Sequence, residues 1–208
     1  MVRSYRQGHR AESAALTRAR ILAAARDLVV SSPFHRLSVD ELARSAGVAR
    51  STVYAIFSDK RGLIQALADD LLARGNFGAM QHALTEPDPA DAIRGVFAVG
   101  TGLWVTDAAL VRQLIGLAMI DPDAATVVAA LDGGRRMAMD VLRSRIEQSG
   151  RARPHLTLDE IGELLWLFSS FESFDALVRG RGLDEATAAR RLVDLAVGLV
   201  RPTRRRRA

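Results

Sequence analysis

Residues 37–60, LSVDELARSAGVARSTVYAIFSDK, hold the pattern that most limits what this chain can fold into. Ser38, with a glutamate three residues on, has the spacing of a capping box at the start of a short helix. Gly47 supplies the backbone freedom that lets this helix end sharply. Beyond it, Val53 and Phe57 stand four residues apart, which gives a second short helix one apolar face. The pattern predicts two short helices joined by a tight turn, which is a helix-turn-helix unit.

The other face of the second helix carries small, hydroxyl-bearing and basic side chains. Such side chains suit close approach to a DNA groove, because hydroxyl and guanidinium groups bond to phosphates and base edges. Arg50 is the predicted base-contacting residue, since Arg pairs with guanine through two hydrogen bonds; contact with phosphate alone is the alternative. We expect Ser51 and Ala55 to meet bases or thymine methyl groups, and Thr52 and Tyr54 to contact the phosphate backbone.

This stretch resembles the DNA-binding domain of the tetracycline-repressor (TetR) family. The matching residues, in order, are Gly47, Val48, Thr52, Val53, Tyr54, Phe57 and Lys60. One position departs from the family pattern, since Ile56 stands where the family often has His or Tyr, and we expect Ile56 to pack instead of contacting phosphate. The resemblance implies that Thr17, Ser38 and Lys60 contact phosphate.

The resemblance also implies a domain organisation. The expected fold is all-α with about nine helices: a three-helix, helix-turn-helix DNA-binding domain over residues 17–60 and a helical ligand-binding and dimerisation domain over 61–200. A composition rich in Ala, Leu and Arg favours helices independently of the resemblance.

Charge is unevenly distributed along the 208 residues. Residues 1–60 hold 10 Lys and Arg against 5 Asp and Glu, whereas residues 61–200 hold 14 against 19. A basic head on an acidic body suits DNA binding, although such charges also simply solvate a surface. Residues 1–16 are predicted to be a flexible basic arm, with contact to a DNA groove as the alternative to plain disorder. Residues 201–208, with five Arg, are predicted to be a disordered basic tail.

Several classes of protein are disfavoured. Cysteine is absent, which removes disulfides and thiolate chemistry. The sequence has no signal-peptide core and no run of about 18 apolar residues, so we expect no membrane partner and a cytoplasmic protein. The His residues have no metal-ligand spacing, and no phosphate loop or nucleophile elbow occurs. We therefore expect no metal, no cofactor and no enzymatic activity.

Met and aromatic residues are spread over the predicted body: Phe77, Met80, Phe97, Trp104, Met119, Met137 and Trp166. Taken alone, such residues fit a helical core as well as a cavity. The family resemblance implies a ligand pocket between the helices of the body, and Met and aromatic side chains suit an adaptable apolar site. We therefore expect an apolar small-molecule effector to bind at these residues.

The last two predicted helices, over residues 158–179 and 184–200, are apolar on more than one side. Such helices are buried on more than one side, which indicates a dimer; a monomer with a thick core is the alternative. The resemblance also implies a homodimer built from these helices. The predicted interface residues are Phe171, Phe174, Val178, Leu192, Leu195 and Leu199.

These observations predict a sequence-specific transcriptional regulator, a ligand-responsive repressor that binds a palindromic double-stranded DNA operator as a homodimer. One alternative is a DNA-binding regulator without a small-molecule effector. A second alternative is a helical ligand-binding or enzymatic protein whose head is vestigial. Specific binding to an operator would separate the second alternative from the others, and release of DNA by a compound would separate the first.

Overall fold

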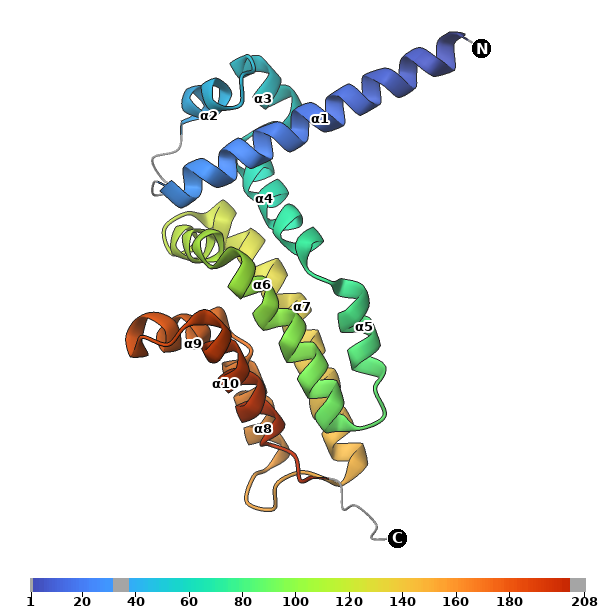
Figure 1. Ribbon diagram of the computed structural model, residues 1–208, viewed down its shortest axis with the longest axis vertical. Coiled ribbons are helices and arrows are strands. Elements are labelled where there is room, and N and C mark those ends of the chain that lie inside the picture. The colour runs from blue at the N-terminus through green and yellow to red at the C-terminus, as the bar shows by residue number, and fades with distance from the viewer. Residues whose placement is uncertain (1, 32–37, 203–208) are drawn as a thin grey trace. The chain divides into compact units, whose positions relative to one another are not determined.

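The computed structural model describes residues 2–31 and 38–202, with side chains from Glu12 onward except that of Phe77. These residues form ten α-helices and one short π-helix, so the all-α prediction is confirmed (Figure 1). One isolated antiparallel bridge joins Ala152 to Val200. The helices are α1 Val2–Ser31, α2 Val39–Ser45, α3 Arg50–Phe57, α4 Lys60–Arg74, α5 Phe77–Thr85, α6 Pro89–Ala118, α7 Pro122–Ser149, α8 Leu158–Phe168, α9 Phe171–Asp175, the π-helical η2 Ala176–Gly180, and α10 Glu185–Val197. Within the described ranges, none of these helices is both long and apolar enough to cross a bilayer.

The described residues fall into two compact units. Unit 1 contains the residues up to Leu71 together with Ala109–Val128, and unit 2 contains Leu72–Ala108 and the residues from Ala129 onward. The sequence predicted one boundary near residue 60, but most of α4 and the turn between α6 and α7 cluster with the helix-turn-helix. An ion pair crosses the predicted boundary, since Arg26 of α1 lies 3.0 Å from Asp70 of α4.

Unit 1 is held together by apolar side chains from four helices. The buried set includes Ile21, Leu22, Ala25 and Val29 of α1, Leu42 of α2, Val53 and Phe57 of α3, and Ile64 and Leu67 of α4. Each large side chain buried in this way contributes about 1.5–3 kcal/mol. Because α2 contacts both α1 and α3, this core fixes the position of the second helix of the helix-turn-helix.

Helix α1 is longer than the sequence indicated. Its backbone is helical from Val2, where a flexible arm was predicted for residues 1–16. The segment from Val2 to Leu16 contains no proline and is rich in Arg and Ala, which favour the helical backbone. Of the predicted basic tail at 201–208, residues 203–208 lie outside the described residues.

Unit 2 is built around a core to which α6, α7, α8 and α10 contribute (Figure 1). Its buried side chains include Ile93, Val96, Phe97, Met139, Leu142, Ile146, Ile161, Leu165, Ala196 and Leu199. The single helix predicted over residues 158–179 is interrupted at Ser169 and Ser170. The hydroxyl of Ser170 accepts a hydrogen bond from the backbone N–H of Ser173 at 3.1 Å, and this competition with the helical ladder starts the new helix α9.

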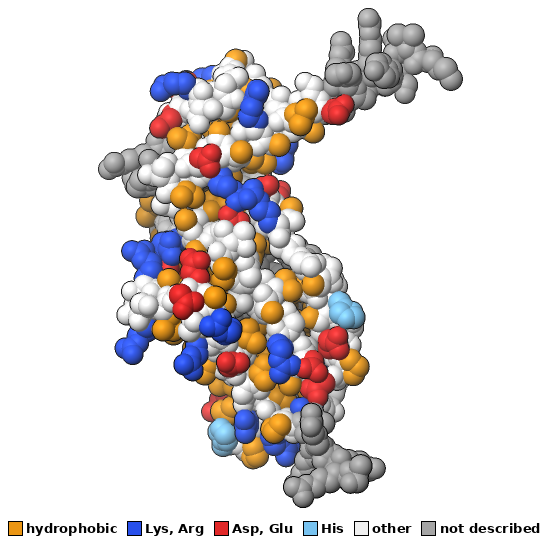
Figure 2. Space-filling model, viewed as in Figure 1, with side chains coloured by type: hydrophobic (Ala, Val, Ile, Leu, Met, Phe, Trp, Pro, Cys, Tyr) orange, Lys and Arg blue, Asp and Glu red, His pale blue; other side chains and the backbone are white. Residues whose placement is uncertain are grey.

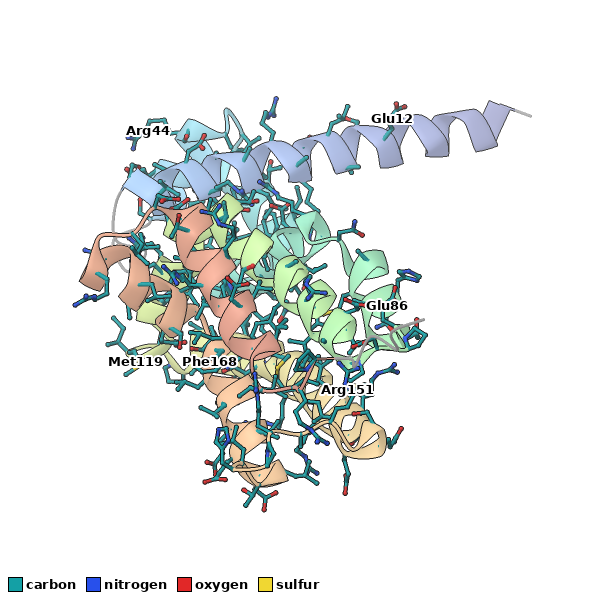
Figure 3. The ribbon with its side chains drawn as sticks, turned by 60° about the horizontal axis from the view of Figure 1, so that its bottom comes forward. Glu12, Arg44, Glu86, Met119, Arg151 and Phe168 are labelled. Carbon is teal, nitrogen blue, oxygen red and sulfur yellow. The ribbon has the colours of Figure 1, made fainter. Side chains whose placement is uncertain are left out.

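The loops at one end of unit 2 are joined by polar contacts. Arg151 of the α7–α8 loop lies 2.8 Å from Asp88 of the α5–α6 loop, and Arg145 donates to the backbone oxygen of Glu86. Glu86 and Arg151 are labelled in Figure 3. In the view of Figure 2, charged side chains of both signs are interspersed over the surface of this unit, unlike a single basic patch.

Candidate nucleic-acid interface

The turn between α2 and α3 follows directly from its sequence. Ser38 caps α2, because its hydroxyl accepts a hydrogen bond from the Glu41 backbone N–H at 3.0 Å, which is one of the two hydrogen bonds of the predicted capping box. Gly47 has a φ of +63°, which is a left-handed conformation that a glycine adopts readily. The backbone N–H of Val48 then bonds to the carbonyl of Ala43 at 2.9 Å. This compact turn sets α3 at a fixed angle to α2.

Helix α3 has one buried face and one open face, as its spacing predicted. Val53 and Phe57 are 3% and 5% exposed and anchor the helix in unit 1. The guanidinium of Arg18 in α1 lies 5.6 Å from the centre of the Phe57 ring, which adds a contact between α1 and α3. The predicted DNA-contacting residues lie at the open face: Arg50, Ser51, Tyr54 and Ala55 are exposed and Thr52 is half-buried. Ile56 is half-buried as well.

Arg50, at the start of α3, is held by two other side chains. Its Nη1 donates to both carboxylate oxygens of Asp40 at 3.1 Å, and its Nη2 donates to the hydroxyl of Tyr54 at 3.4 Å. The guanidinium also lies 5.6 Å from the centre of the Tyr54 ring. The hydrogen bond with Tyr54 and then the attraction of Asp40 raise the pKa of Arg50 above its ordinary value.

Lys60, at the first position of α4, is paired with Asp121 in the turn between α6 and α7. The Nζ–Oδ2 distance is 2.6 Å, and the Asp121 side chain is only 19% exposed. The hydrogen bond from Lys60, followed by the one from the Ala124 backbone, lowers the pKa of Asp121. The cation that the family resemblance assigns to phosphate therefore has an intramolecular partner in this structure.

The remaining predicted phosphate contacts lie at two other places in unit 1. Thr17 is half-buried on α1, and its hydroxyl donates to the carbonyl of Ser13 at 2.9 Å. Ser38 is exposed at the N-terminus of α2, where unpaired backbone N–H groups favour an anion. These residues were predicted from the sequence, whereas Asp40 and Asp121 were not. A carboxylate ten residues before Arg50 carries no signal of its own, because the turn geometry alone brings the two groups together.

The predicted effector residues differ widely in burial. Phe97 and Trp104 are buried, Met80 and Trp166 are half-buried, and Met119 and Met137 are 81% and 68% exposed. Met119 belongs to unit 1 and the others to unit 2, and the side chain of Phe77 lies outside the described part. Phe97 and Trp104 pack in the core, which was the alternative to a ligand pocket. The Trp104 ring lies 6.3 Å from that of Phe171 and 5.8 Å from that of Phe174.

Trp166 is engaged by two Arg side chains of α7. The guanidinium of Arg135 lies 3.4 Å from the ring centre and that of Arg136 lies 4.6 Å from it. Arg135 also donates to the backbone oxygen of Trp166 at 3.0 Å and pairs with Asp132 at 2.9 Å. These contacts account for the half-buried position of Trp166 without a ligand.

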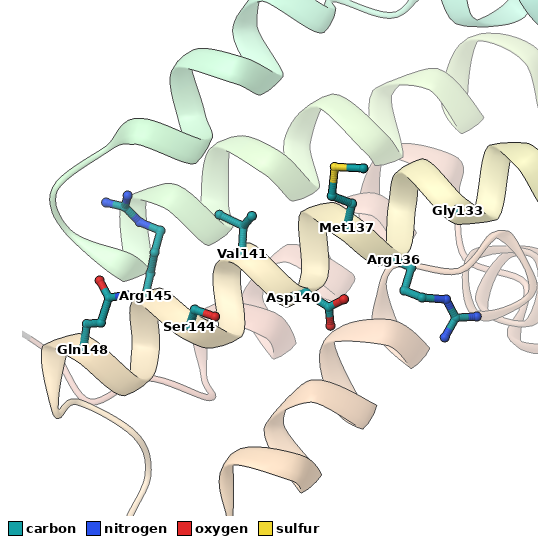
Figure 4. Close-up of a pocket in the computed structure, with 8 residues that line it drawn as sticks. All are labelled: Gly133, Arg136, Met137, Asp140, Val141, Ser144, Arg145 and Gln148. Carbon is teal, nitrogen blue, oxygen red and sulfur yellow. The ribbon is translucent and has the colours of Figure 1, made fainter.

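Two open grooves occur in unit 2. One follows the surface of α7, has a volume of about 560 Å³, and is lined by Gly133, Arg136, Met137, Asp140, Val141, Ser144, Arg145 and Gln148 (Figure 4). Met137 is the one predicted effector residue that lines it. The other lies between α5 and α6 and is lined mainly by Ala79, His82, Ala83, Glu86, Asp91, Arg94, Gly95, Ala98 and Val99. Neither set of lining residues is mainly aromatic, unlike the pocket that the sequence predicted. Within the described ranges, no three His, Asp or Glu side chains are grouped as a metal site.

The predicted dimer residues divide into two groups. Phe171, Phe174, Leu192 and Leu199 are at most 6% exposed within the single chain, so they have little surface to give to a partner. Leu195 is 49% exposed on α10 and Val178 is half-buried in η2. Leu167, which was not singled out as an interface residue, is 53% exposed on α8.

Helices α1, α2 and α3, with Arg50 exposed on α3, form a helix-turn-helix unit, a fold that is typical of DNA-binding proteins. Residues 21–67 match a family model described as "Bacterial regulatory proteins, tetR family". The match covers the helix-turn-helix, and it agrees with the resemblance to this family drawn from the residues around Gly47.

One curated relative is an HTH-type transcriptional regulator, EthR, from Mycolicibacterium smegmatis. It is 39% identical over 77 residues, which are 36% of this chain and 36% of the relative. The chain therefore spans about a third of this relative's length in the alignment.

Solved structures resemble the chain over most of its length. NalD of Pseudomonas aeruginosa, the secondary repressor of the MexAB-OprM multidrug efflux pump, has a TM-score of 0.71 at 24% identity, covering 90% of this chain and 98% of that one. FadR of Bacillus subtilis in complex with stearoyl-CoA has a TM-score of 0.71 at 17% identity, covering 88% and 99%. At such identities the similarity concerns the fold.

Proposed function

We propose that this chain is a transcriptional repressor that binds a specific DNA sequence through α3. The observation that carries the proposal is the pair of faces on α3: Val53 and Phe57 anchor the helix, and Arg50 stands exposed at its first position. In helix-turn-helix proteins the N-terminal residues of the second helix contact base edges in the major groove. We propose that Arg50 contacts a guanine through two hydrogen bonds, since its exposed position at the start of α3 is one from which such residues reach bases.

The operator is proposed to be palindromic and to be bound by a homodimer. Helices α8 and α10 contact each other, and they carry Leu167 and Leu195 with about half of each side chain exposed. Large apolar side chains exposed on neighbouring helices favour association with a second copy. Two copies related by a two-fold axis would place their α3 helices one DNA turn apart, roughly 34–36 Å, and would read the same bases in each half-site.

Selection from a random DNA library, followed by fluorescence-anisotropy titration of the selected sequence, tests this function. We expect an enriched palindrome, and Arg50→Ala should weaken its binding by about 1–3 kcal/mol while relaxing preference at one base pair per half-site. Arg190→Ala is the matched control, because it removes the same charge from α10 in unit 2 and should leave base preference unchanged. A wild-type chain that enriches no sequence, or an Arg50→Ala chain that loses affinity equally for selected and random DNA, would contradict base contact by Arg50.

Release of DNA by an amphiphilic small molecule is proposed as the means of regulation. The groove on α7 is lined by the exposed apolar side chains of Met137 and Val141 and by the basic side chains of Arg136 and Arg145 (Figure 4). Its lining therefore includes both apolar and cationic groups. The FadR structure, similar in fold, is a complex with stearoyl-CoA, which itself combines an acyl chain with phosphates. A regulator without a small-molecule effector is the second candidate, favoured by the buried positions of Phe97 and Trp104.

Stearoyl-CoA is a direct probe of this regulation. Trp166 and Trp104 are the only tryptophans in the chain, and both belong to unit 2. A true effector should change their fluorescence, raise the melting temperature and weaken operator binding over one concentration range. Arg136→Ala should shift that range upward, whereas Arg190→Ala should not. If the operator complex survives saturating stearoyl-CoA and a broader set of acyl and apolar compounds, the effector-free regulator is the correct function.

A further inference from the structure

The carboxylate of Asp40 forms hydrogen bonds with Arg50, the residue on which the proposed base recognition depends. Arg50 and Asp40 are 58% and 60% exposed, so neither is buried by the fold, yet the Asp40 carboxylate accepts two hydrogen bonds of 3.1 Å from Arg50. Tyr54, one helical turn along α3, receives a third contact from the same guanidinium at 3.4 Å. An exposed Arg without such partners samples many rotamers.

We infer that Asp40 is a positioning residue for base recognition: it orients the Arg50 guanidinium toward the major groove and thereby sets base preference. The inference rests on the proposed function, and it adds a residue of α2 to the recognition surface of α3. Asp40 acts through Arg50 and need not touch the DNA.

The free energy of binding depends on how well the Arg50 side chain is ordered before DNA binds. A side chain ordered before binding loses less conformational entropy when the complex forms, which is worth about 0.5–1.5 kcal/mol for a long side chain. The guanidinium carries five N–H donors, so three contacts leave donors for the two acceptors of a guanine edge. The gain occurs only where a guanine receives these donors, so it favours the correct base pair over the others.

The charge of Asp40 supports a role in specificity over one in affinity. A carboxylate beside a DNA-binding face repels phosphates whatever their sequence, so it lowers binding to all DNA. A residue that weakens nonspecific binding and also orders a base-contacting group increases the difference in affinity between the operator and other DNA. Asp40 and Arg50 together suit an operator in which each half-site contains a guanine that accepts hydrogen bonds from Arg50.

Four variants and one control test the inference: Asp40→Asn, Arg50→Ala, the double variant, Asp40→Glu and the control Glu41→Gln. Glu41 is the exposed neighbour on the same helix, so its variant removes the same charge while a Gln keeps the capping spacing. Affinity is measured for the selected operator, for each single-base-pair variant of a half-site and for random DNA, at one salt concentration. Circular dichroism checks that each variant is folded.

Arg50→Ala should remove discrimination at one base pair per half-site. Asp40→Asn should reduce discrimination at that same base pair by about threefold to tenfold, which corresponds to the cost of ordering one side chain. It should also bind random DNA more tightly than wild type does, and so should Glu41→Gln. Asp40→Glu should restore part of the discrimination. The double variant should show the base profile of Arg50→Ala alone, because Asp40 has no other route to the base.

The inference is wrong if Asp40→Asn has the wild-type base profile, or if it differs from Glu41→Gln in no respect. It is also wrong if Asp40→Asn changes the base profile in the Arg50→Ala background, because Asp40 would then contact a base directly, as an acid does with cytosine. A wild-type chain that selects no sequence would overturn the proposed function as well. A wild-type chain that selects an operator while Asp40→Asn leaves its base profile unchanged would overturn only the role of Asp40.

Discussion

The ammonium group of Lys60 lies 2.6 Å from Oδ2 of Asp121, 61 residues further along the chain. The other carboxylate oxygen of Asp121 accepts hydrogen bonds from the backbone N–H groups of Asp123 at 3.0 Å and Ala124 at 3.1 Å, so the same residue caps α7. One carboxylate thus serves both the first turn of a helix and the only lysine in the chain. A DNA phosphate that binds Lys60 must compete with this carboxylate.

This competition predicts the effect of Asp121→Asn on DNA binding. Asn retains the helix cap but carries no charge, so Lys60 should be more available to phosphate. The Lys60 side chain is 50% exposed, so water screens its ion pair with Asp121 and the pair is worth about 0–1 kcal/mol. We therefore expect binding to all DNA sequences to tighten by up to about fivefold. Anisotropy titrations on operator and random DNA measure it. Asp123→Asn is the control for charge, and an equal effect from that variant would rule out a special role for Asp121.

Removal of Lys60 should change the dependence of DNA binding on salt. Each lost phosphate contact reduces the slope of log affinity against log salt by about 0.9. Lys60→Ala should therefore give a shallower slope, by about one contact for each protomer, together with weaker binding to every sequence. Titrations between low and moderate salt measure the slope. An unchanged slope would show that Lys60 stays with Asp121 in the DNA complex.

The lowered pKa of Asp121 predicts a loss of stability in acid. A carboxylate whose pKa is lower in the folded than in the unfolded chain stabilises the fold at pH values above its unfolded pKa, which is about 3.9 for Asp. This contribution should be constant near neutral pH and should be lost as the pH falls below about 4, through the folded value. Melting temperatures of wild type and Asp121→Asn from pH 7 to pH 2 measure it. The two curves should converge at low pH, and parallel curves would be evidence against the linkage.

The aromatic cluster of unit 2 should be needed for stability. Phe174 is fully buried, and its ring lies 5.8 Å from Trp104 and 6.0 Å from Phe171. Phe174→Ala leaves a cavity and should lower the free energy of unfolding by about 3–5 kcal/mol. Met137→Ala, at a 68% exposed position, should change it by less than about 0.5 kcal/mol. Urea denaturation followed by tryptophan fluorescence compares them, and similar midpoints for the two variants would contradict the assignment of Phe174 to the core.

The proposed dimer predicts different results for two leucines of α10. Leu195 is 49% exposed and Leu192 is 2% exposed. Leu195→Asp should give a folded monomer with weakened operator binding, because the charge enters only the interface with the second copy. Leu192→Asp should unfold the chain, because it buries a charge in the core. Light scattering and circular dichroism distinguish these states. A Leu195→Asp chain that stays dimeric would place the interface elsewhere.

The motif between Ser38 and Lys60 was sufficient to predict the helix-turn-helix, because its signals are local. A helix cap, a glycine at a turn and a four-residue apolar spacing act within one or two helical turns. The predicted anchors Val53 and Phe57 are buried, and the open face of α3 is the predicted one. The long helix from Val2 was not predicted, because basic composition was read as disorder although the same residues favour a helix.

Composition and periodicity could not assign the aromatic and Met residues of the body. A residue such as Trp104 has the same spacing whether its ring packs on Phe174 or lines a cavity, so burial alone separated Phe97 and Trp104 from Met119 and Met137. The broad apolar faces of the last two predicted helices were likewise predicted to form the dimer interface. Phe174 and Leu192 are in fact already buried within the chain.

The sequence by itself determined the helical class, the turn at Gly47 and the open face of α3, because these depend on interactions between residues a few positions apart. Only the tertiary structure decided that Asp40 lies on Arg50 and that Asp121 lies on Lys60. The members of the first pair are 10 positions apart in the sequence, and those of the second are 61 positions apart. No local sequence pattern indicates which cation each carboxylate will contact. Their positions follow from how the apolar faces of the helices pack, since that packing places each carboxylate within hydrogen-bonding distance of one cation.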